Sequence, residues 1–316
     1  MIIIKRFCVM AFVITVCLFL LLRYSGISQI KYIRTQIVAT AMTTQSHQSI
    51  AFVVASMDEI DIIIASAITE SDIKSTIDGV MVLDSYHCTK GFDFLEEGIY
   101  IREISKYGFD GKLMLVLDPS RIFIGTAQDL GWRGSTVREM AEVNGAIAGI
   151  NGGFFSGPMP TGFVISDNRR VFPCYNYTYI TTIVGFTNCN ILVIGAYTEK
   201  EALSVDIRDS LSTFPITIVN GEPQITEGDG GWGIAPRTAI AQRKDGAVLF
   251  LVIEGRRMLS LGATLRQAQD ILMENNAYNA IFLDGGSSSV MFYRGSYLTT
   301  PSLGFERDIP TAFLVR

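Results

Sequence analysis

The feature that most constrains this chain is a junction that occurs twice, in which an apolar run stops at an amide or carboxylate followed by two glycines. Residues 148–150 lead into Asn151-Gly152-Gly153, and residues 281–283 lead into Asp284-Gly285-Gly286. A buried strand that ends this way places a polar side chain and backbone N–H groups at one edge of a sheet. Glycine there lets the backbone turn and a ligand approach closely. The junctions together predict a site for a polar or anionic small molecule, although each one alone also fits an ordinary turn.

Composition narrows the class of protein. Of the 316 residues, 48% are hydrophobic and 18% are charged, which favours a folded chain over a disordered one. On a scale of ~150 residues per domain, this length predicts one large or two modest domains. The net charge of -5 and the pI of about 5.2 exclude the basic surface typical of nucleic-acid binding.

The N-terminus predicts a transmembrane signal anchor over residues 1–23. The stretch Phe7–Leu22 carries no charge and is flanked by Lys5, Arg6 and Arg23. It is slightly shorter than the ~20 residues of a usual span, but flanking Lys and Arg side chains can snorkel and extend it. A buried core helix and a cleaved signal peptide are the alternatives. The flanking charges do not decide the orientation, so an extracytoplasmic location for the rest of the chain is a hypothesis.

Cysteine and histidine limit the available chemistry. The five cysteines show no Cys-x-x-Cys spacing, and at most one disulfide is expected, with Cys174 and Cys189 as an open pairing. The two histidines, His47 and His87, are distant in sequence from every glycine junction. A Ser-His-Asp triad on residues 287–289 and a histidine-rich zinc site are therefore not expected. Carboxylates, arginines and backbone dipoles remain as the catalytic groups.

The chain divides into three regions. Residues 24–97 carry no assignable motif; within them, 40–49 are polar and predict a linker, and 50–84 indicate a small subdomain or a membrane-proximal segment. From residue 98 to 316 the pattern is regular and predicts one domain.

Helices are expected over 136–144 and 264–274, each with a capping-box spacing at its start. Each helix is followed by a strand that runs into a glycine junction. Many further strand-like runs and few helices predict an α+β fold with mixed, largely antiparallel sheets rather than Rossmann-type winding. Asn220-Gly221 predicts a hairpin turn.

The junctions form part of an ordered set of motifs that resembles the phosphodiester glycosidase domain, the family that includes N-acetylglucosamine-1-phosphodiester α-N-acetylglucosaminidase. The resemblance covers roughly residues 98–316, in the family's order. The motifs are residues 149–155 with 160–162, Asn220-Gly221-Glu222-Pro223, residues 235–240, Glu254-Gly255-Arg256, residues 283–289 and Glu306-Arg307. Two positions depart from the family pattern. Glu254 stands where the family often has Asp, and Ser287 stands where a third glycine is common.

The resemblance implies hydrolysis of a bond between an anomeric carbon and a phosphodiester oxygen. It assigns catalytic roles to Asp284, Glu254, Arg237 and Asn151. Arg237 is the first candidate to neutralise the phosphate and Arg256 the second, because a guanidinium matches phosphate oxygens in a bidentate manner. The expected substrate-binding residues are Gly152, Gly153, Thr238, Arg256, Gly285, Gly286, Ser287, Ser288 and Trp232.

Several of these roles have structural alternatives. Thr238 also fits core packing, Arg256 also fits a surface ion pair, and Trp232, in the glycine-rich stretch 228–233, fits either a sugar-stacking residue or the plug of a surface cluster. No cofactor is expected to be required. Ca²⁺ or Mg²⁺ bridged by Glu254 and Asp284 is the alternative, because hard oxygen ligands suit these ions.

The resemblance is strongest to bacterial membrane-anchored members associated with exopolysaccharide. We therefore expect a single-pass hydrolase that cleaves a sugar-1-phosphodiester in a cell-surface or exopolysaccharide glycan, with a phosphorylated carbohydrate as its partner and no nucleic acid. A non-catalytic module that binds phosphorylated glycans is the main alternative, and a structural envelope protein is the third. The identity of the sugar and the oligomeric state stay open.

Overall fold

The computed structural model describes residues 2–44, 48–67, 73–76, 80, 88–174, 179–258 and 260–316, with side chains from residue 10 onward. His47 and His87, which bear on the expected absence of a triad, lie outside these ranges. The chain forms two compact units, one of residues 1–68 with 227–234 and one of residues 69–226 with 235–316.

The first unit is helical. It contains α1 (Ile2–Tyr24), α2 (Ser28–Met42), α3 (Ser49–Val54) and α4 (Met57–Ala65). Arg34 of α2 is buried, and its guanidinium donates to the carbonyls of Leu22 and Arg23 and pairs with Glu59 at 2.8 Å. This arginine therefore joins the end of α1 to α2 and α4. A small apolar core lies beneath it, formed by Val38, Ala41, Ala51, Val54, Ala55 and Ile60.

The predicted linker over 40–49 is wrong where the structure describes it. Residues 40–42 are the last turn of α2, and Ser49 begins α3. The hydroxyls of Thr43 and Thr44 donate to the carbonyls of Ala39 and Ala41, so the polar side chains are satisfied by the end of the helix itself.

A distant loop, Glu227–Ile234, belongs to the same unit. Gln36 of α2 donates to the Asp229 carboxylate, and the Thr40 hydroxyl accepts the Ile234 N–H at 3.1 Å. Trp232 is half-buried in this loop, whereas Asp284 belongs to the second unit. A sugar-stacking role for Trp232 thus stays a prediction.

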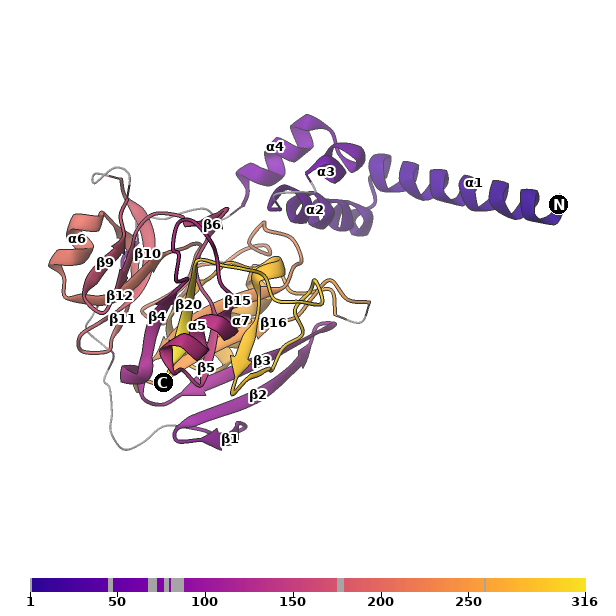
Figure 1. Cartoon of the computed structure of the whole chain (residues 1–316). Helices are drawn as coiled ribbons and strands as arrows, with labels where there is room; N and C mark the ends of the chain where they lie inside the picture. The colour runs from indigo at the N-terminus through magenta and orange to yellow at the C-terminus, as the bar shows by residue number, and fades with distance from the viewer. Residues whose placement is uncertain are drawn as a thin grey trace. The chain divides into compact units, whose positions relative to one another are not determined.

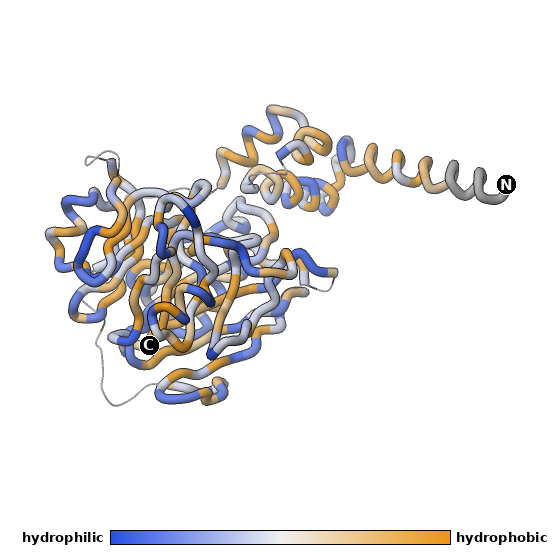
Figure 2. The backbone as a smooth tube through the Cα atoms, in the orientation of Figure 1, coloured by the Kyte–Doolittle hydropathy of each residue, from blue (hydrophilic) through white to orange (hydrophobic). Residues whose placement is uncertain are grey.

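The described part of α1 is mostly apolar up to Arg23 in its last turn (Figure 2). Among residues with described side chains, no single helix has the length and hydropathy of a membrane span. The pair Met10–Tyr24 and Ser28–Met42 meets that measure together, with a bend of 91° between them.

The second unit contains three main sheets and a short hairpin of β6 (Phe155–Ser156) and β7 (Met159–Pro160) (Figure 1). The eight-stranded sheet has the order β1 (Asp93–Glu96), β2 (Ile99–Lys106), β3 (Phe109–Val116), β16 (Val248–Ile253), β15 (Arg237–Arg243), β17 (Ala277–Phe282), β13 (Ile216–Val219), β14 (Glu222–Pro223). One five-stranded sheet has the order β11 (Leu192–Tyr197), β10 (Thr181–Thr187), β12 (Ile207–Ser212), β8 (Val164–Ser166), β9 (Arg169–Phe172). The other has the order β19 (Ser296–Tyr297), β18 (Met291–Tyr293), β5 (Ala148–Asn151), β20 (Thr311–Val315), β4 (Ile122–Thr126).

The described strand pairings are antiparallel, which agrees with the predicted α+β fold and its largely antiparallel sheets. One apolar core is shared by all three sheets, with Met114, Phe250, Phe313 and Phe186 among its members. The β1–β2 hairpin begins before residue 98, so the predicted domain boundary falls inside a paired element.

Helices α5 (Val137–Asn144), α6 (Glu199–Ser204) and α7 (Leu265–Glu274) complete the unit, with short 3₁₀ turns η1 (Pro119–Arg121) and η2 (Gly286–Ser288). The capping boxes predicted for α5 and α7 are present, at Thr136 with Glu139 and at Thr264 with Gln267. The predicted hairpin at Asn220-Gly221 joins β13 to β14, and both residues have positive φ.

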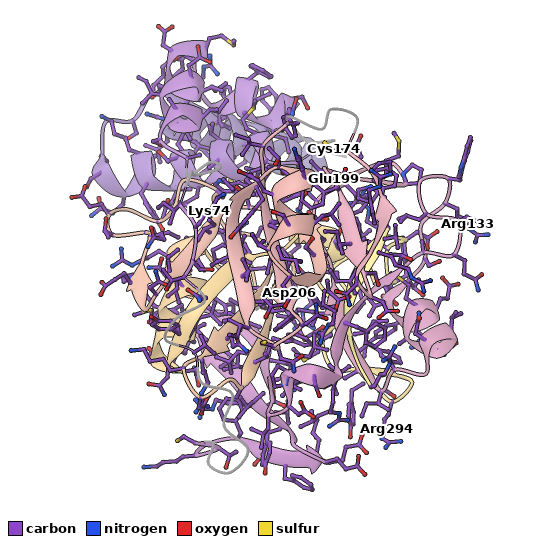
Figure 3. The ribbon with its side chains drawn as sticks, turned by 90° about the vertical axis from the view of Figure 1, so that its left-hand side faces the viewer. Lys74, Arg133, Cys174, Glu199, Asp206 and Arg294 are labelled. Atoms are coloured by element: carbon purple, nitrogen blue, oxygen red, sulfur yellow. The ribbon has the colours of Figure 1, made fainter. Side chains whose placement is uncertain are left out.

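Helix α6 was not predicted from sequence. Its first residue, Glu199, is buried; the carboxylate pairs with Arg170 and accepts the Cys174 N–H at 2.7 Å, and Figure 3 shows Glu199 and Cys174 close together. Cys174 is buried and Cys189 exposed, and both are free thiols, so the open pairing between them is not made.

Candidate active site

The two glycine junctions meet in space. The Asn151 side-chain amide donates to the Asp284 carbonyl at 2.6 Å, and the Asp284 N–H donates to the Gly152 carbonyl at 3.1 Å. These bonds connect the end of β5 to the end of β17, although Asn151 and Asp284 are 133 residues apart in the sequence. The polar edge inferred from the sequence is therefore one place in the structure.

The Arg237 segment lies against the same edge. The Leu283 N–H donates to the Thr238 carbonyl and the Gly286 N–H to the Pro236 carbonyl, both at 2.9 Å. Arg237 begins β15 and is 5% exposed, and its Nε donates to the Ala263 carbonyl at 3.0 Å. Arg237 and Asp284 are thus on neighbouring segments, with the arginine mostly buried.

Asn151 and Thr238 lie next to Asp284 but are not exposed, and their predicted contacts with substrate stay a prediction. Both are fully buried, and the Thr238 hydroxyl donates to Asn151 Oδ1 at 2.8 Å. The same oxygen accepts the Val290 N–H at 3.2 Å, while Nδ2 donates to the Asp284 carbonyl. The Asn151 side chain is occupied by protein partners, so it positions Asp284.

The glycines of the first junction pack closely against other strands. A Cβ on Gly152 would lie 2.5 Å from the Thr311 carbonyl oxygen, and one on Gly153 would lie 2.2 Å from that of Ser212. The approach of β20 and β12 is by itself enough to require glycine at both positions. Along η2, the N–H groups of Gly286, Ser288 and Ser289 donate to protein carbonyls, so little of the predicted anion-binding backbone is free.

Asp284 carries the reactive character of the site. The residue is half-buried, and its carboxylate accepts hydrogen bonds from the Ser288 hydroxyl and the Gly285 N–H. Desolvation by the surrounding protein raises the pKa of Asp284 to about 6, against the lowering effects of these bonds and of Arg307 and Arg256. A carboxyl group poised this close to neutrality, beside cations, is typical of functional sites.

Two arginines face this carboxylate. Arg256 is exposed, and its Nη2 would lie 3.0 Å from a Cβ on Gly286, a residue in the left-handed region with φ of 61°. Arg307 Nη1 lies 3.5 Å from the Ser288 hydroxyl, and its guanidinium stacks 4.6 Å above the Phe155 ring. The sequence motif contained Arg307, but no role was assigned to it.

The neighbouring Glu306 explains the placement of Arg307. Its carboxylate accepts the Val137 N–H at the start of α5 and the Tyr297 hydroxyl at 2.6 Å. Burial raises the pKa of Glu306, opposed by these hydrogen bonds. A capped helix end therefore anchors the chain one residue before the arginine.

Glu254 is held by protein groups on both oxygens. Oε1 accepts the Thr300 N–H at 2.9 Å, and Oε2 pairs with Arg257 Nη2 at 2.5 Å. A cation bridged by Glu254 and Asp284 would have to displace these donors. Within the described ranges, no group of three or more His, Cys, Asp and Glu side chains gathers as a metal site would require. Ser287, beside Gly286, is half-buried, and its predicted contact with substrate stays a prediction.

The raised pKa of Asp284 predicts a pH-dependent stability. Between its ordinary value of about 3.9 and about 6, the folded protein binds more protons than the unfolded chain, so the free energy of unfolding falls as pH rises through this window. We expect the Asp284→Asn variant to gain roughly 1–2 kcal/mol over wild type near pH 7 and to lose that advantage near pH 4. Denaturant unfolding at both pH values measures this difference. A gap that does not change with pH would mean that Asp284 ionises normally.

The fold and these motifs are those of the phosphodiester glycosidase family. The family's sequence profile matches residues 144–316, and the chain belongs to this family.

Three proteins illustrate the similarity. The chain is 29% identical over 203 residues to the SPbeta prophage-derived uncharacterized protein YomE of Bacillus subtilis (strain 168), covering 61% of this chain and 30% of that protein. It is 30% identical over 217 residues to human N-acetylglucosamine-1-phosphodiester alpha-N-acetylglucosaminidase, covering 61% of this chain and 41% of the human protein. The chain thus spans well under half the length of these curated relatives.

A solved structure shares the fold. The zebrafish N-acetylglucosamine-1-phosphodiester alpha-N-acetylglucosaminidase catalytic domain, auto-inhibited by its pro-peptide, superposes with a TM-score of 0.59 at 22% identity. The match covers 69% of this chain and 82% of the zebrafish chain.

Proposed function

We propose that this protein hydrolyses a sugar-1-phosphodiester, cleaving the bond between the anomeric carbon and the phosphate oxygen. N-acetylglucosamine is the proposed sugar, because the human and zebrafish relatives are named for that activity. A cell-surface or exopolysaccharide glycan is the proposed natural context, on the strength of the motif resemblance.

The observation that carries the proposal is the position of Asp284. A desolvated carboxylate with a pKa raised to about 6 lies within the electrostatic reach of Arg256 and Arg307, at the point where the two glycine junctions are hydrogen-bonded together. An anionic substrate needs cations, and an electron-poor sugar carbon needs a carboxylate. This arrangement supplies both.

The chemistry follows from these groups. Arg256 and Arg307 bind the phosphate oxygens and neutralise the charge that grows on the leaving phosphate. Because a phosphate ester leaves readily, the ionised Asp284 carboxylate has the main task of stabilising the oxocarbenium-like transition state at the anomeric carbon. Water then adds to that carbon, giving the free sugar and a phosphate monoester.

The roles of the remaining predicted residues are revised accordingly. Asn151 and Thr238 position Asp284, Glu254 holds the Thr300 segment and Arg257, and Arg237 supports the floor of the site through its bond to Ala263. The proposed reaction requires no metal or organic cofactor.

The direct test uses the full-length chain and the methyl diester of N-acetylglucosamine 1-phosphate. Release of free N-acetylglucosamine by wild type, and not by Asp284→Asn, supports the proposal. Saturable binding of the diester without release of sugar would instead support the non-catalytic glycan-binding module.

Substituting Arg307 tests its contact with phosphate. We expect Arg307→Lys to lower kcat/KM for the diester by about 10–100-fold, because lysine cannot reproduce the forked, stacked geometry of the guanidinium. Steady-state kinetics measures the loss. The control is Arg294→Lys, which alters an exposed pair with Glu96 and should leave the kinetics unchanged (Figure 3). Equal effects of both substitutions would remove Arg307 from the site.

We further propose that α1 anchors the protein in a membrane with the second unit outside the cytoplasm. The support is the uncharged run Phe7–Leu22, whose described side chains are mostly exposed and apolar. Cell fractionation and protease accessibility of the second unit test this. Recovery of the intact chain in the soluble fraction would contradict it.

A further inference from the structure

Two segments bordering the candidate site end in exposed apolar side chains. One is the hairpin that follows Glu254, with Met258 94% exposed and Leu261 60% exposed. The other is the loop 300–307, with Phe305 65% exposed and Leu303 49% exposed. We call these four side chains the apolar rim.

Both ends of the loop 300–307 contact residues at or next to the site. At its beginning, the Thr300 N–H donates to the Glu254 carboxylate at 2.9 Å. At its end, Glu306 is fixed to α5 and Tyr297, and Arg307 approaches Ser288 and the Phe155 ring. Leu303 and Phe305 therefore lie on a stretch that is anchored at both ends by residues of the site.

The hairpin begins at the site as well. Its backbone is closed by bonds from the Arg256 N–H to the Leu261 carbonyl and from the Arg257 N–H to the Ser260 carbonyl. Arg256 contributes one of the two guanidinium groups that act on Asp284, and Arg257 pairs with Glu254. Met258 is thus two residues from a proposed phosphate ligand.

Exposed apolar side chains also occur elsewhere in this unit, for example Phe94, Trp132 and Leu203, and single ones on a protein surface need no explanation. The apolar rim differs from such single residues because its four large side chains lie on two segments, each of which starts or ends at a proposed phosphate-binding arginine. Exposed apolar side chains on segments next to a site can extend its binding surface, and here the neighbouring charge is the charge that would hold a phosphodiester.

We propose that the apolar rim binds the aglycone of the substrate, and that this aglycone is an alkyl or prenyl chain esterified to the sugar 1-phosphate. This inference rests on the proposed function. In the complex, the sugar carbon faces Asp284, the phosphate is held by Arg256 and Arg307, and the chain on the second ester oxygen lies along Met258, Leu261, Leu303 and Phe305. The natural substrate class is then a lipid-linked sugar phosphodiester.

The test compares two substrates of the full-length chain, the methyl and the hexyl diesters of N-acetylglucosamine 1-phosphate. Each methylene removed from water strengthens binding by about fourfold when fully buried, so partial burial of the hexyl chain predicts a KM lower by about tenfold at similar kcat. In the double variant Leu303→Ser, Phe305→Ser, the preference for the hexyl diester should disappear while turnover of the methyl diester persists. Because wild type and variant are assayed with the same two esters, differences in ester solubility cancel when their hexyl-to-methyl preferences are compared.

The matched control is Leu203→Ser. Leu203 is 47% exposed on α6, close to the 49% of Leu303, and it should leave the hexyl preference intact. Met258→Ser provides a second rim variant should the double variant unfold, which its thermal melting curve reports.

The outcomes separate the two proposals. Equal KM values for both diesters in wild type would overturn the lipid-aglycone inference and leave the hydrolase standing. If neither diester is cleaved, the proposed hydrolase is wrong, and calorimetric binding then tests the apolar rim by itself. Tighter binding of the hexyl diester to wild type, lost in the double variant, supports the lipid-aglycone inference. Equal binding of the two diesters overturns that inference. Loss of binding to phosphatidylcholine vesicles, with an unchanged ester preference, would assign these side chains to a bilayer surface and also overturn the proposal.

Discussion

Replacing Asp284 by Asn is expected to lower kcat for sugar-phosphodiester hydrolysis by on the order of 10³-fold. The amide keeps the shape of the carboxylate and can still bond Ser288, but it carries no charge to stabilise an electron-poor sugar carbon. KM should change little, because Arg256 and Arg307 still bind the phosphate. Initial rates of N-acetylglucosamine release over a range of diester concentrations measure both constants.

Stability provides the control for this experiment. Since ionised Asp284 is desolvated in the folded state, the variant should melt no lower than wild type at neutral pH. A variant that is inactive and also strongly destabilised would indicate a structural carboxylate. Wild-type turnover in the variant would place the chemistry at another residue.

The second large effect is expected on stability. Asn151→Ala removes the group that satisfies the Asp284 carbonyl, the Val290 N–H and the Thr238 hydroxyl, all in a buried setting. Leaving these partners unsatisfied should cost about 3 kcal/mol, which lowers Tm by about 6–12 °C in a domain of this size. Thermal unfolding monitored by circular dichroism tests the value, and activity below the transition should fall as well because Asp284 loses its support.

Asn279→Ala is the matched control. Asn279 is equally buried in β17, but its side chain has one described bond, accepted from the Asn220 N–H at 2.8 Å, and its amide nitrogen has no partner. Its loss should cost about 1 kcal/mol and leave activity unchanged. If the two alanine variants behave alike, the junction between β5 and β17 has no special role.

Local signals predicted much of the fold. The capping boxes at Thr136 and Thr264 mark helix starts because the side-chain and backbone groups involved are three residues apart and need no tertiary context. Helix α6 has the same signal at Thr198 with Glu201 and was overlooked. Strand β12 was missed because Asp209, Ser210 and Ser212 resemble a loop, whereas in the structure they are buried.

The candidate site was predictable only in part. The sequence identified Asp284 and the junction residues, because strand ends and glycines are visible in a linear pattern. The sequence could not show that the Asn151 side chain hydrogen-bonds to protein groups, since Thr238 and Val290 come close to it only after folding. Arg307 was overlooked for the same reason, because its place depends on Glu306 reaching α5.

The position of β20 has a consequence for the order of folding. This strand, from residues 311–315, inserts between β4 and β5, and Ala312 pairs with Asn151. The sheet that carries Asn151 therefore closes only after residues 311–315 have been synthesised, and closure over so long a loop is slow. A chain truncated before residue 311 should leave Asn151 without its partner strand and the edge that holds Asp284 unformed.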